Sequence, residues 1–270
     1  MFSNPLESPR LVVRQVLGSR VYSVRVLLHG DVGSSSKSTG GSNLTRVRGS
    51  KEREERRTVI SNEEFAAMLS KAGQIENEFL RLRNLALLCL LRLTGKRRGE
   101  IAMLPLDNIK VESGFLAATF ILEKKRKGSV LRKQAIKLIP LTDSLTEPII
   151  KYLNHLKGLE PKPKFLFPSV KSFFGTSFII QFDKHISGRQ VFRVVRSTSA
   201  GVWPHLFRET VGSDVIKQDS SIIGAFKVMR RLDLEDYKTG FNYLRRYAGD
   251  VIRREEEKLK AEGMVSQRSE

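Results

Sequence analysis

Cysteine is almost absent from this chain of 270 residues. The one cysteine, Cys89, cannot form a disulfide within the chain. It lies in the apolar run LALLCLL, where we expect a buried side chain. Because a chain without internal disulfides suits a reducing compartment, we expect a cytoplasmic protein.

Long apolar runs are lacking as well. The longest uncharged apolar run extends from Leu85 to Leu91, whereas a helix needs about 20 apolar residues to span a bilayer. The N-terminus shows no compact apolar segment ahead of a small-residue cleavage site, so we expect no signal peptide. The sequence therefore predicts no association with a membrane.

Acidic residues are too few to balance the basic ones. The chain has 48 lysines and arginines against 29 aspartates and glutamates, which gives a formal net charge of +19. A protein this basic most often acts on a polyanion, and nucleic acid is the first candidate. No cluster of carboxylates indicates a metal site, and we expect no cofactor. The aromatic platforms typical of RNA-binding modules are also lacking, which disfavours RNA as the partner.

The composition changes near residue 57. Residues 30–50 are rich in glycine, serine and threonine, which predicts a flexible linker or a disordered tail, and the charged run over 51–57 continues it. Before the linker, apolar and polar residues alternate around Gly18 and Ser19, as in a short β-hairpin. We therefore expect a basic N-terminal tail over 1–56 and one main domain over 57–262.

The first half of the main domain combines helices with two strands. A helix is expected after Ser61 or Asn62 as the N-cap. The stretch 80–93 is apolar on nearly all sides, which is typical of a central helix, and Gly95 is expected to end it. A short helix follows and stops at Pro105. Residues 115–123 and 130–141 have the composition of two strands joined by the basic turn KKRKGS.

The second half is predicted to be helical. A helix is expected over 141–156, and from about 171 to 262 we expect helices broken near Gly175, Gly188, Gly201 and Gly240. The fold class is thus predicted to be α+β, mainly α, with a small antiparallel sheet.

Basic side chains gather at three separated points of this domain. These are Lys96 to Arg98 after the central helix, Lys124 to Lys127 in the turn between the strands, and His205 with Arg208. Each cluster alone has a structural explanation, as charges at a helix end, a solvated turn or a helix cap. Together they place fixed cations around one domain, as the binding of a phosphate requires.

The sequence resembles the catalytic domain of the tyrosine recombinases, the phage integrase family, over residues 57–250. TGKRRGEIAMLPLDNI resembles the family's first arginine box, T-G-x-R-x-x-E-I/L, with Arg97 and Glu100 on its charged positions. PHLFRET is similar to the second box, P-H-x-x-R-H/E-T/S, with His205 and Arg208 in place. The stretches RRTVISNEEFAAML, IKLIPL and FLFPS stand in the family's order around these boxes.

The resemblance implies a reaction in which a tyrosine hydroxyl attacks a DNA phosphorus. It forms a 3′-phosphotyrosyl link and a free 5′-hydroxyl, and rejoining needs neither ATP nor metal. The resemblance assigns Arg97 and Arg208 to the charge on the phosphate. His205 is assigned to orienting the phosphate or to proton transfer. A lysine of the strand–turn–strand segment would protonate the departing oxygen; Lys124 and Lys125 both qualify, and Lys127 is a third possibility.

The nucleophile is less well defined by the resemblance. After the second box the family has a helix ending in G-H, then D/S-L/I-x-T-T-x-x-Y. Matching its D-L step to Asp233 and Leu234 selects Tyr243 with about three inserted residues and places Arg231 where the family has a histidine or tryptophan. Tyr237 is the alternative nucleophile, and Tyr247 is a weaker one.

Family members commonly carry an N-terminal helical domain that grips the other face of the duplex. We expect no such domain in residues 1–56, whose arginines would add phosphate contacts without sequence preference. The chain would then be a minimal recombinase, or a truncated or non-catalytic DNA-binding remnant of an integrase. The resemblance implies double-stranded DNA as the partner and a homotetramer on it. The polar segment 248–263 would dock on a neighbouring copy or form a solvated end.

Overall fold

The computed structural model describes residues 11–17, 20–26, 59–123, 134–173 and 177–261. The chain divides into two compact units, residues 1–56 with 170–181, and residues 57–169 with 182–270. In the smaller unit, β1 (Leu11–Leu17) and β2 (Arg20–Val26) pair antiparallel in the stretch predicted to form a hairpin. The turn between them and the predicted linker over 30–50 lie outside the described residues.

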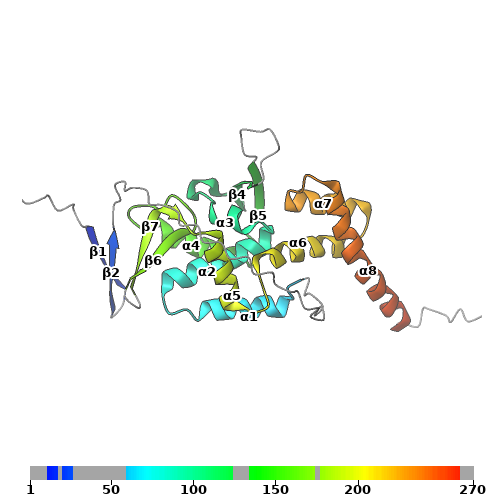
Figure 1. Cartoon of the computed structure of the whole chain (residues 1–270), viewed down its shortest axis with the longest axis horizontal. Helices are drawn as coiled ribbons and strands as arrows, with labels where there is room; N and C mark the ends of the chain where they lie inside the picture. Colours follow the sequence, from blue (N-terminus) through cyan, green and yellow to red (C-terminus); the bar gives the residue numbers. More distant parts are fainter. Residues whose placement is uncertain (1–10, 18–19, 27–58, 124–133, 174–176, 262–270) are drawn as a thin grey trace, which may run out of the picture. The chain divides into compact units, whose positions relative to one another are not determined.

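The larger unit is mainly helical, as predicted, and carries a small antiparallel sheet (Figure 1). Its helices are, in chain order, α1 (Asn62–Gly73), α2 (Glu78–Thr94), α3 (Arg98–Ala102), the 3₁₀ turn η1 (Leu106–Asn108), α4 (Thr146–Lys157), α5 (Gly188–Thr198), α6 (Pro204–Gln218), α7 (Ile222–Leu232) and α8 (Tyr237–Ala261). The strands of its main sheet are β3 (Ile109–Glu112), β4 (Phe115–Ile121) and β5 (Gln134–Pro140).

Helix α2 forms the centre of the larger unit. It packs against α1, α4 and α6, and its residues 86–91 are fully buried, so it is covered on most faces as its sequence predicted. Ser61 caps α1 through a hydrogen bond from the backbone N–H of Glu64. Gly95 ends α2 in the left-handed region, at φ 60°. A Cβ on Gly95 would also lie 2.7 Å from Cδ2 of Leu232, so glycine serves both the turn and the close approach of α7.

The main sheet has one more strand than the sequence indicated. The strand order is β3-β4-β5, with both pairs antiparallel, and β3 was not predicted. Leu116, Ala118 and Phe120 of β4 alternate toward the core and are fully buried. The basic turn between β4 and β5, with Lys124, Lys125 and Lys127, lies outside the described residues.

The prediction of helices from about residue 171 is wrong for its first part. β6 (Pro168–Phe173) and β7 (Ser177–His185) form a two-stranded sheet there, and Gly175 lies outside the described residues. The predicted breaks near Gly188 and Gly201 are confirmed, and the one at Gly240 is wrong. Gly188 begins α5 and Gly201 lies between α5 and α6, but Gly240 lies inside α8 and does not break it.

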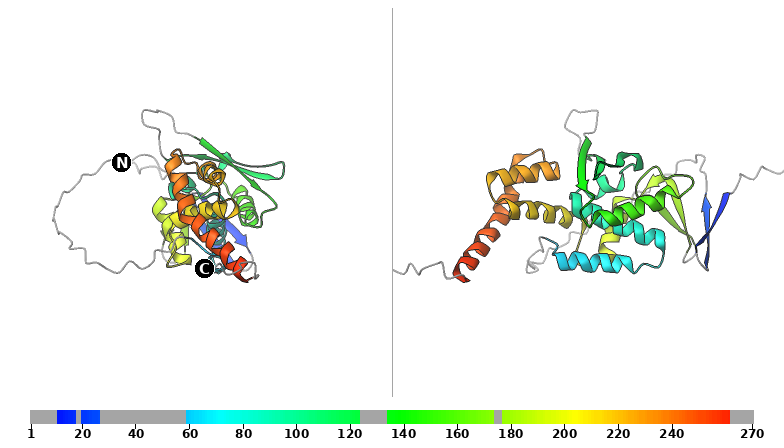
Figure 2. Two further views of the ribbon diagram at one scale, coloured as in Figure 1. Left: turned by 90° about the vertical axis from the view of Figure 1, so that its right-hand side faces the viewer. Right: turned by 180° about the vertical axis from the view of Figure 1, so that it is seen from behind.

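Helices α6, α7 and α8 pack on one another and form a hydrophobic core of their own (Figure 2). The buried members of this core are Val211, Ile216, Val228, Leu232, Tyr243 and Tyr247. Tyr243 and Tyr247 thus enter from α8 against α6. This packing brings residues of the second arginine box and of the C-terminal region to the same place.

Candidate active site

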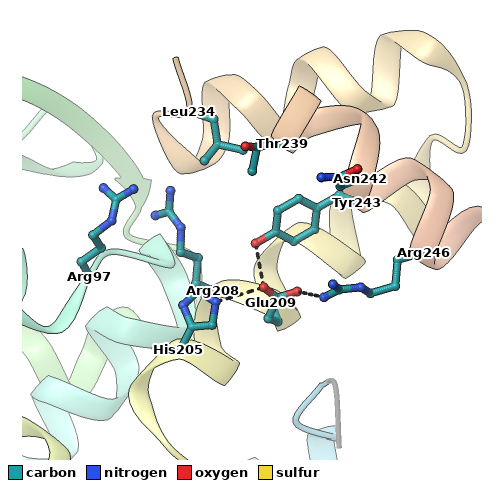
Figure 3. A pocket seen from close by; sticks show the side chains of 9 residues that line it. All are labelled: Arg97, His205, Arg208, Glu209, Leu234, Thr239, Asn242, Tyr243 and Arg246. Atoms are coloured by element: carbon teal, nitrogen blue, oxygen red, sulfur yellow. Dashed lines mark hydrogen bonds and ion pairs between the residues drawn. The ribbon is translucent and has the colours of Figure 1, made fainter. Parts of the chain in front are cut away.

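A pocket of about 330 Å³ opens between α6, α8 and the segment that joins α2 to α3 (Figure 3). Its lining contains Arg97, His205 and Arg208, which the sequence singled out. The lining residues are Arg97, His205, Arg208, Glu209, Leu234, Thr239, Asn242, Tyr243 and Arg246. Figure 3 shows the two guanidinium groups of Arg97 and Arg208 beside each other, with the ring of Tyr243 across the pocket from them.

Arg97 is positioned by a buried glutamate. It is the N-cap residue of α3, and its backbone N–H donates to Oε2 of Glu100 at 3.1 Å. Its Nη1 donates to Oε1 of the same carboxylate at 3.0 Å. Glu100 is buried while Arg97 is partly exposed, so the carboxylate fixes the guanidinium from the protein side. The remaining N–H donors of Arg97 are left available to a ligand.

Arg208 is held by two backbone carbonyls. The residue is buried within α6, and its Nη1 donates to the carbonyl oxygen of Gly95 at 3.0 Å. Its Nη2 donates to the carbonyl oxygen of Leu232. Burial and the neighbouring Arg97 lower the pKa of Arg208, yet a guanidinium starts far enough above neutrality to remain charged. The side chain therefore presents a rigid cation to the pocket.

His205 lies one helical turn before Glu209 at the start of α6. Its side chain is 64% exposed, and its Nε2 lies 3.1 Å from Oε1 of Glu209. The imidazole therefore stands at the mouth of the pocket and is open to a ligand.

Tyr243 projects from α8 into the pocket. Its hydroxyl donates to Oε1 of Glu209 at 3.2 Å. Its ring packs over α6 at Gly212, where a Cβ would lie only 2.3 Å from the ring carbon Cε1. Burial, and then the charge of Glu209, raise the pKa of this phenol above its ordinary value. Tyr243 is thus held as a neutral phenol beside the arginines.

The two other candidate tyrosines do not line the pocket. Tyr237, the first residue of α8, is 59% exposed. Tyr247 is buried one turn after Tyr243, and its hydroxyl donates to Oε2 of Glu209 at 3.1 Å. Among the tyrosines of the described residues, the structure brings Tyr243 to Arg97, His205 and Arg208.

The placement of Arg231 beside the other site residues is corrected by the structure. Its Nη2 donates to the carbonyl oxygen of Leu93 at 2.7 Å, and the residue does not line the pocket. Helix α7 ends at Leu232, and Asp233 follows in the left-handed region at φ 51°. This is the conformation that suits the glycine of the G-H pattern. Leu234, which does line the pocket, then takes the place of the histidine.

The register of the C-terminal pattern changes accordingly. With Asp233 in the glycine position, the run from Asp236 to Tyr243 aligns with D/S-L/I-x-T-T-x-x-Y without any inserted residue, although Tyr237 and Gly240 depart from the pattern. Asp236 also accepts a hydrogen bond from the backbone N–H of Lys238 at 2.9 Å, as a residue at the start of a helix does. The sequence alone misplaced this segment because it does not show where α7 ends.

The lysines that the sequence suggested as the acid, Lys124, Lys125 and Lys127, lie outside the described residues. A second pocket of about 260 Å³ shares Arg97, His205 and Arg208 with the first. Its lining also includes Glu123, the last described residue before that turn. The backbone N–H of Glu123 donates to Oε1 of Glu100 at 3.5 Å. The end of β4 therefore lies at the same group of cations.

Sequence analysis gave no role to Glu209, which contacts both of the helices that form the pocket. Its carboxylate accepts hydrogen bonds from Tyr243 and Tyr247 and pairs with His205 and Arg246. Burial would raise its pKa, but the hydrogen bonds from His205 and Tyr247 and the charge of Arg246 outweigh burial and lower it. The spacing of His205 and Glu209, four residues apart on one helix, is the sequence signal that would have indicated their contact.

Asp233 was also missed as a contact point. Its carboxylate pairs with Nζ of Lys96 at 2.8 Å and with Nζ of Lys137, from β5, at 2.9 Å. Lys137 also donates to the carbonyl oxygens of Arg230 and Arg231. Burial lowers the pKa of both lysines, although Asp233 acts in the opposite direction. This ion cluster fixes the α7–α8 turn, and with it the start of the helix that carries Tyr243.

Within the part of the chain that the structure describes, no group of three or more His, Cys, Asp or Glu side chains is arranged to hold a metal ion. No helix there is both long and apolar enough to cross a membrane.

The sequence model of the phage integrase family matches residues 58–247. The fold is similar to that of XerH site-specific recombinase bound to palindromic difH substrate in a post-cleavage complex, with a TM-score of 0.56 and 18% identity over 77% of this chain and 54% of that one. A pre-cleavage complex of XerH with difH substrate gives a TM-score of 0.52 and 19% identity over 72% and 52%. The structure of XerA recombinase gives a TM-score of 0.52 and 16% identity over 70% of this chain and 60% of that one.

The chain thus spans between about half and three fifths of the length of these solved structures. At these levels of identity, the likeness concerns the fold. A search of curated proteins found no match.

Proposed function

The chain belongs to the phage integrase family, and from that premise we propose that it cuts and rejoins DNA at specific sites through a 3′-phosphotyrosyl intermediate. One observation supports this function above the others. A phenol, two guanidiniums and an imidazole, from Tyr243, Arg97, Arg208 and His205, line a single pocket. These groups suit an attack on a phosphodiester, whose negative charge grows in the transition state.

In the cleavage step, the hydroxyl oxygen of Tyr243 forms a bond to the phosphorus while the bond to the 5′-oxygen breaks. The phosphotyrosyl link retains the energy of the phosphodiester, so a 5′-hydroxyl can reverse the step without ATP. Rejoining to a different 5′-hydroxyl yields a recombined strand.

Arg97 and Arg208 are the groups proposed to stabilise the pentacoordinate transition state. Both are fixed before DNA arrives, Arg97 by Glu100 and Arg208 by the carbonyl oxygens of Gly95 and Leu232. Donors that need no rearrangement contribute most to catalysis, and the loss of one typically costs about 10²–10³ in rate.

His205 is exposed at the mouth of the pocket, where it would contact the phosphate or exchange a proton with it. The proposed acid for the departing 5′-oxygen is Lys124 or Lys125, or else Lys127. The position of Glu123 beside Arg97 in the second pocket supports this assignment, because these lysines follow Glu123 in the chain.

Double-stranded DNA is the proposed partner, and the net charge of +19 supports it. We also propose that the chain acts as a homotetramer. Exchange between two duplexes cuts four strands, and each chain supplies one nucleophile that stays bound to a strand end. Four copies are therefore needed to complete the exchange.

The test is covalent capture from a library of duplexes with random sequence, each carrying a nick close to the cleavage point. The short 5′-hydroxyl fragment then diffuses away and the intermediate cannot reverse. We expect wild-type protein to form an adduct that survives denaturation and is digested by protease, and Tyr243→Phe to form none. Tyr237→Phe is the matched control and should react like wild type.

Two outcomes would contradict this assignment. If Tyr243→Phe is captured and Tyr237→Phe is not, the nucleophile is Tyr237. If wild-type protein binds duplex DNA but no adduct forms with any library member, the chain is a non-catalytic DNA-binding protein.

A further inference from the structure

A partly buried negative charge stands in a pocket proposed to bind an anion. The Glu209 side chain is 13% exposed and lines the pocket together with Arg97 and Arg208. A carboxylate at this place repels a phosphate and weakens the field of the two arginines. The binding of DNA alone therefore does not explain why a carboxylate lies in this pocket.

Within the described residues, four groups able to donate a proton contact this carboxylate. Oε1 faces the hydroxyl of Tyr243 at 3.2 Å and Nε2 of His205 at 3.1 Å. Oε2 faces Nη1 of Arg246 at 2.9 Å and the hydroxyl of Tyr247 at 3.1 Å. Such surroundings keep the carboxylate ionised near neutral pH. An ionised carboxylate hydrogen-bonded to a phenol is able to take its proton.

We propose that Glu209 is a catalytic residue that accepts the proton of Tyr243 during cleavage, an inference that rests on the function proposed above. As the oxygen of Tyr243 forms its bond to phosphorus, the O–H proton moves to Oε1 of Glu209. The bond from phosphorus to the 5′-oxygen breaks, and that oxygen takes a proton from the acid of the site. In rejoining, Glu209 returns its proton to the departing phenol.

The neighbours of Tyr243 favour Glu209 for this role. Arg97 and Arg208 are guanidiniums and have no site for a proton. Leu234, which occupies the place of the family's histidine, has no titratable group. His205 contacts Oε1 of Glu209 and would stabilise the charge there before the transfer. The direct hydrogen bond from the Tyr243 hydroxyl to Glu209 is the shortest route for the proton.

A purely structural role for Glu209 predicts different behaviour. The carboxylate joins α6 to α8 through Tyr247 and Arg246, so its loss could simply loosen the two helices. A structural clasp would change the melting temperature. It would not make the rate of adduct formation depend on whether residue 209 can accept the proton of Tyr243.

The experiment compares Glu209→Gln, Glu209→Asp and wild type on two nicked substrates captured from the library. One substrate has the natural 5′-oxygen at the cleaved bond, and the other has sulfur there, which departs without needing a proton. Glu147→Gln is the matched control, because Glu147 forms an exposed ion pair with Lys151 on α4, outside the pocket. Single-turnover adduct formation and melting temperature are measured for each protein.

We expect Glu209→Gln to form adduct at least about 10²-fold more slowly than wild type on both substrates, the range of general base catalysis. The sulfur substrate should not restore the rate of Glu209→Gln, because the step that this variant lacks is removal of the proton from Tyr243. Glu209→Asp, which keeps a carboxylate, should recover part of the rate, and Glu147→Gln should match wild type.

Three results would overturn the inference. The first is a rate of adduct formation by Glu209→Gln within threefold of wild type. The second is a restored rate of Glu209→Gln on the sulfur substrate. The third is an equal loss of rate in Glu209→Asp and Glu209→Gln while both variants melt like wild type. If instead wild-type protein forms no adduct with either substrate, the proposed function fails and this inference falls with it.

Discussion

At the scale of single residues, the position of Tyr243 depends on a neighbour without a side chain. The tyrosine ring lies against the backbone of α6 at Gly212, and a methyl group there would overlap the ring. Glycine at the middle of a helix costs about 1 kcal/mol relative to alanine. Here that cost is offset by the close approach of the phenol to Glu209 and the arginines.

We therefore expect Gly212→Ala to slow adduct formation by about 10²-fold, the scale of loss for a displacement near 1 Å of a reacting group. The added Cβ would lie 2.3 Å from Cε1 of Tyr243, so the ring has to move. The measurement is single-turnover capture on the nicked substrate.

Gly249→Ala provides the control, because Gly249 is also helical and a Cβ there meets nothing within 4 Å. It should react like wild type. Equal rates for Gly212→Ala and wild type would mean that the ring position seen here is not the reactive one.

The sequence identified part of the site at this scale and missed another part. Arg97, His205 and Arg208 stand within short motifs whose spacing is visible in the chain. Glu209 stands beside them, but its contact with Tyr243 joins residues 34 positions apart. That contact exists only because α8 packs on α6, which no local pattern reveals.

At the scale of elements, the α7–α8 turn is fixed from two sides. Lys96 precedes α3 and Lys137 belongs to β5, and both ammonium groups meet the carboxylate of Asp233 in the turn. Lys96 is only 1% exposed and also lies over the ring of Phe120, with Nζ 4.8 Å from the centroid. Because both lysines are buried, the stability of the fold depends on the Asp233 carboxylate that neutralises them.

We expect Asp233→Asn to lower the free energy of unfolding by about 3 kcal/mol, since it leaves two buried cations without their counterion. Asparagine tolerates the left-handed conformation, so the substitution tests the charge and not the turn. Denaturant unfolding measures the change, with Glu147→Gln as the exposed control that should show none. A loss for Asp233→Asn no larger than that of the control would show that the cluster does not stabilise the fold.

Elements were predicted well where local patterns dominate. The apolar stretch of α2 and the caps at Ser61 and Gly95 were evident from residue types alone. The β6–β7 pair was mistaken for helix because a short run of apolar residues suits either structure. Its strands are defined by pairing with each other, a tertiary preference that overrides local propensity.

At the scale of the whole molecule, the excess of basic residues bears on the proposed binding of DNA. With a net charge of +19, binding should weaken steeply as salt rises, with a slope of log K against log salt of about −0.9 for each phosphate contacted. We expect Arg97→Ala to reduce the magnitude of that slope by about one. Fluorescence anisotropy of a labelled duplex over a range of salt concentrations gives both values. A slope near zero for wild type would contradict a binding mode based on phosphate contacts.

Helix α8 continues unbroken from Tyr237 to Ala261, so Tyr243 lies within a helix and not in a loop beside one. At about 1.5 Å per residue, roughly 27 Å of α8 extends beyond Tyr243. In the proposed intermediate, the DNA strand is attached to Tyr243 within this rigid helix. Binding of a partner to the C-terminal end of α8 would therefore restrain the orientation of the attached strand end.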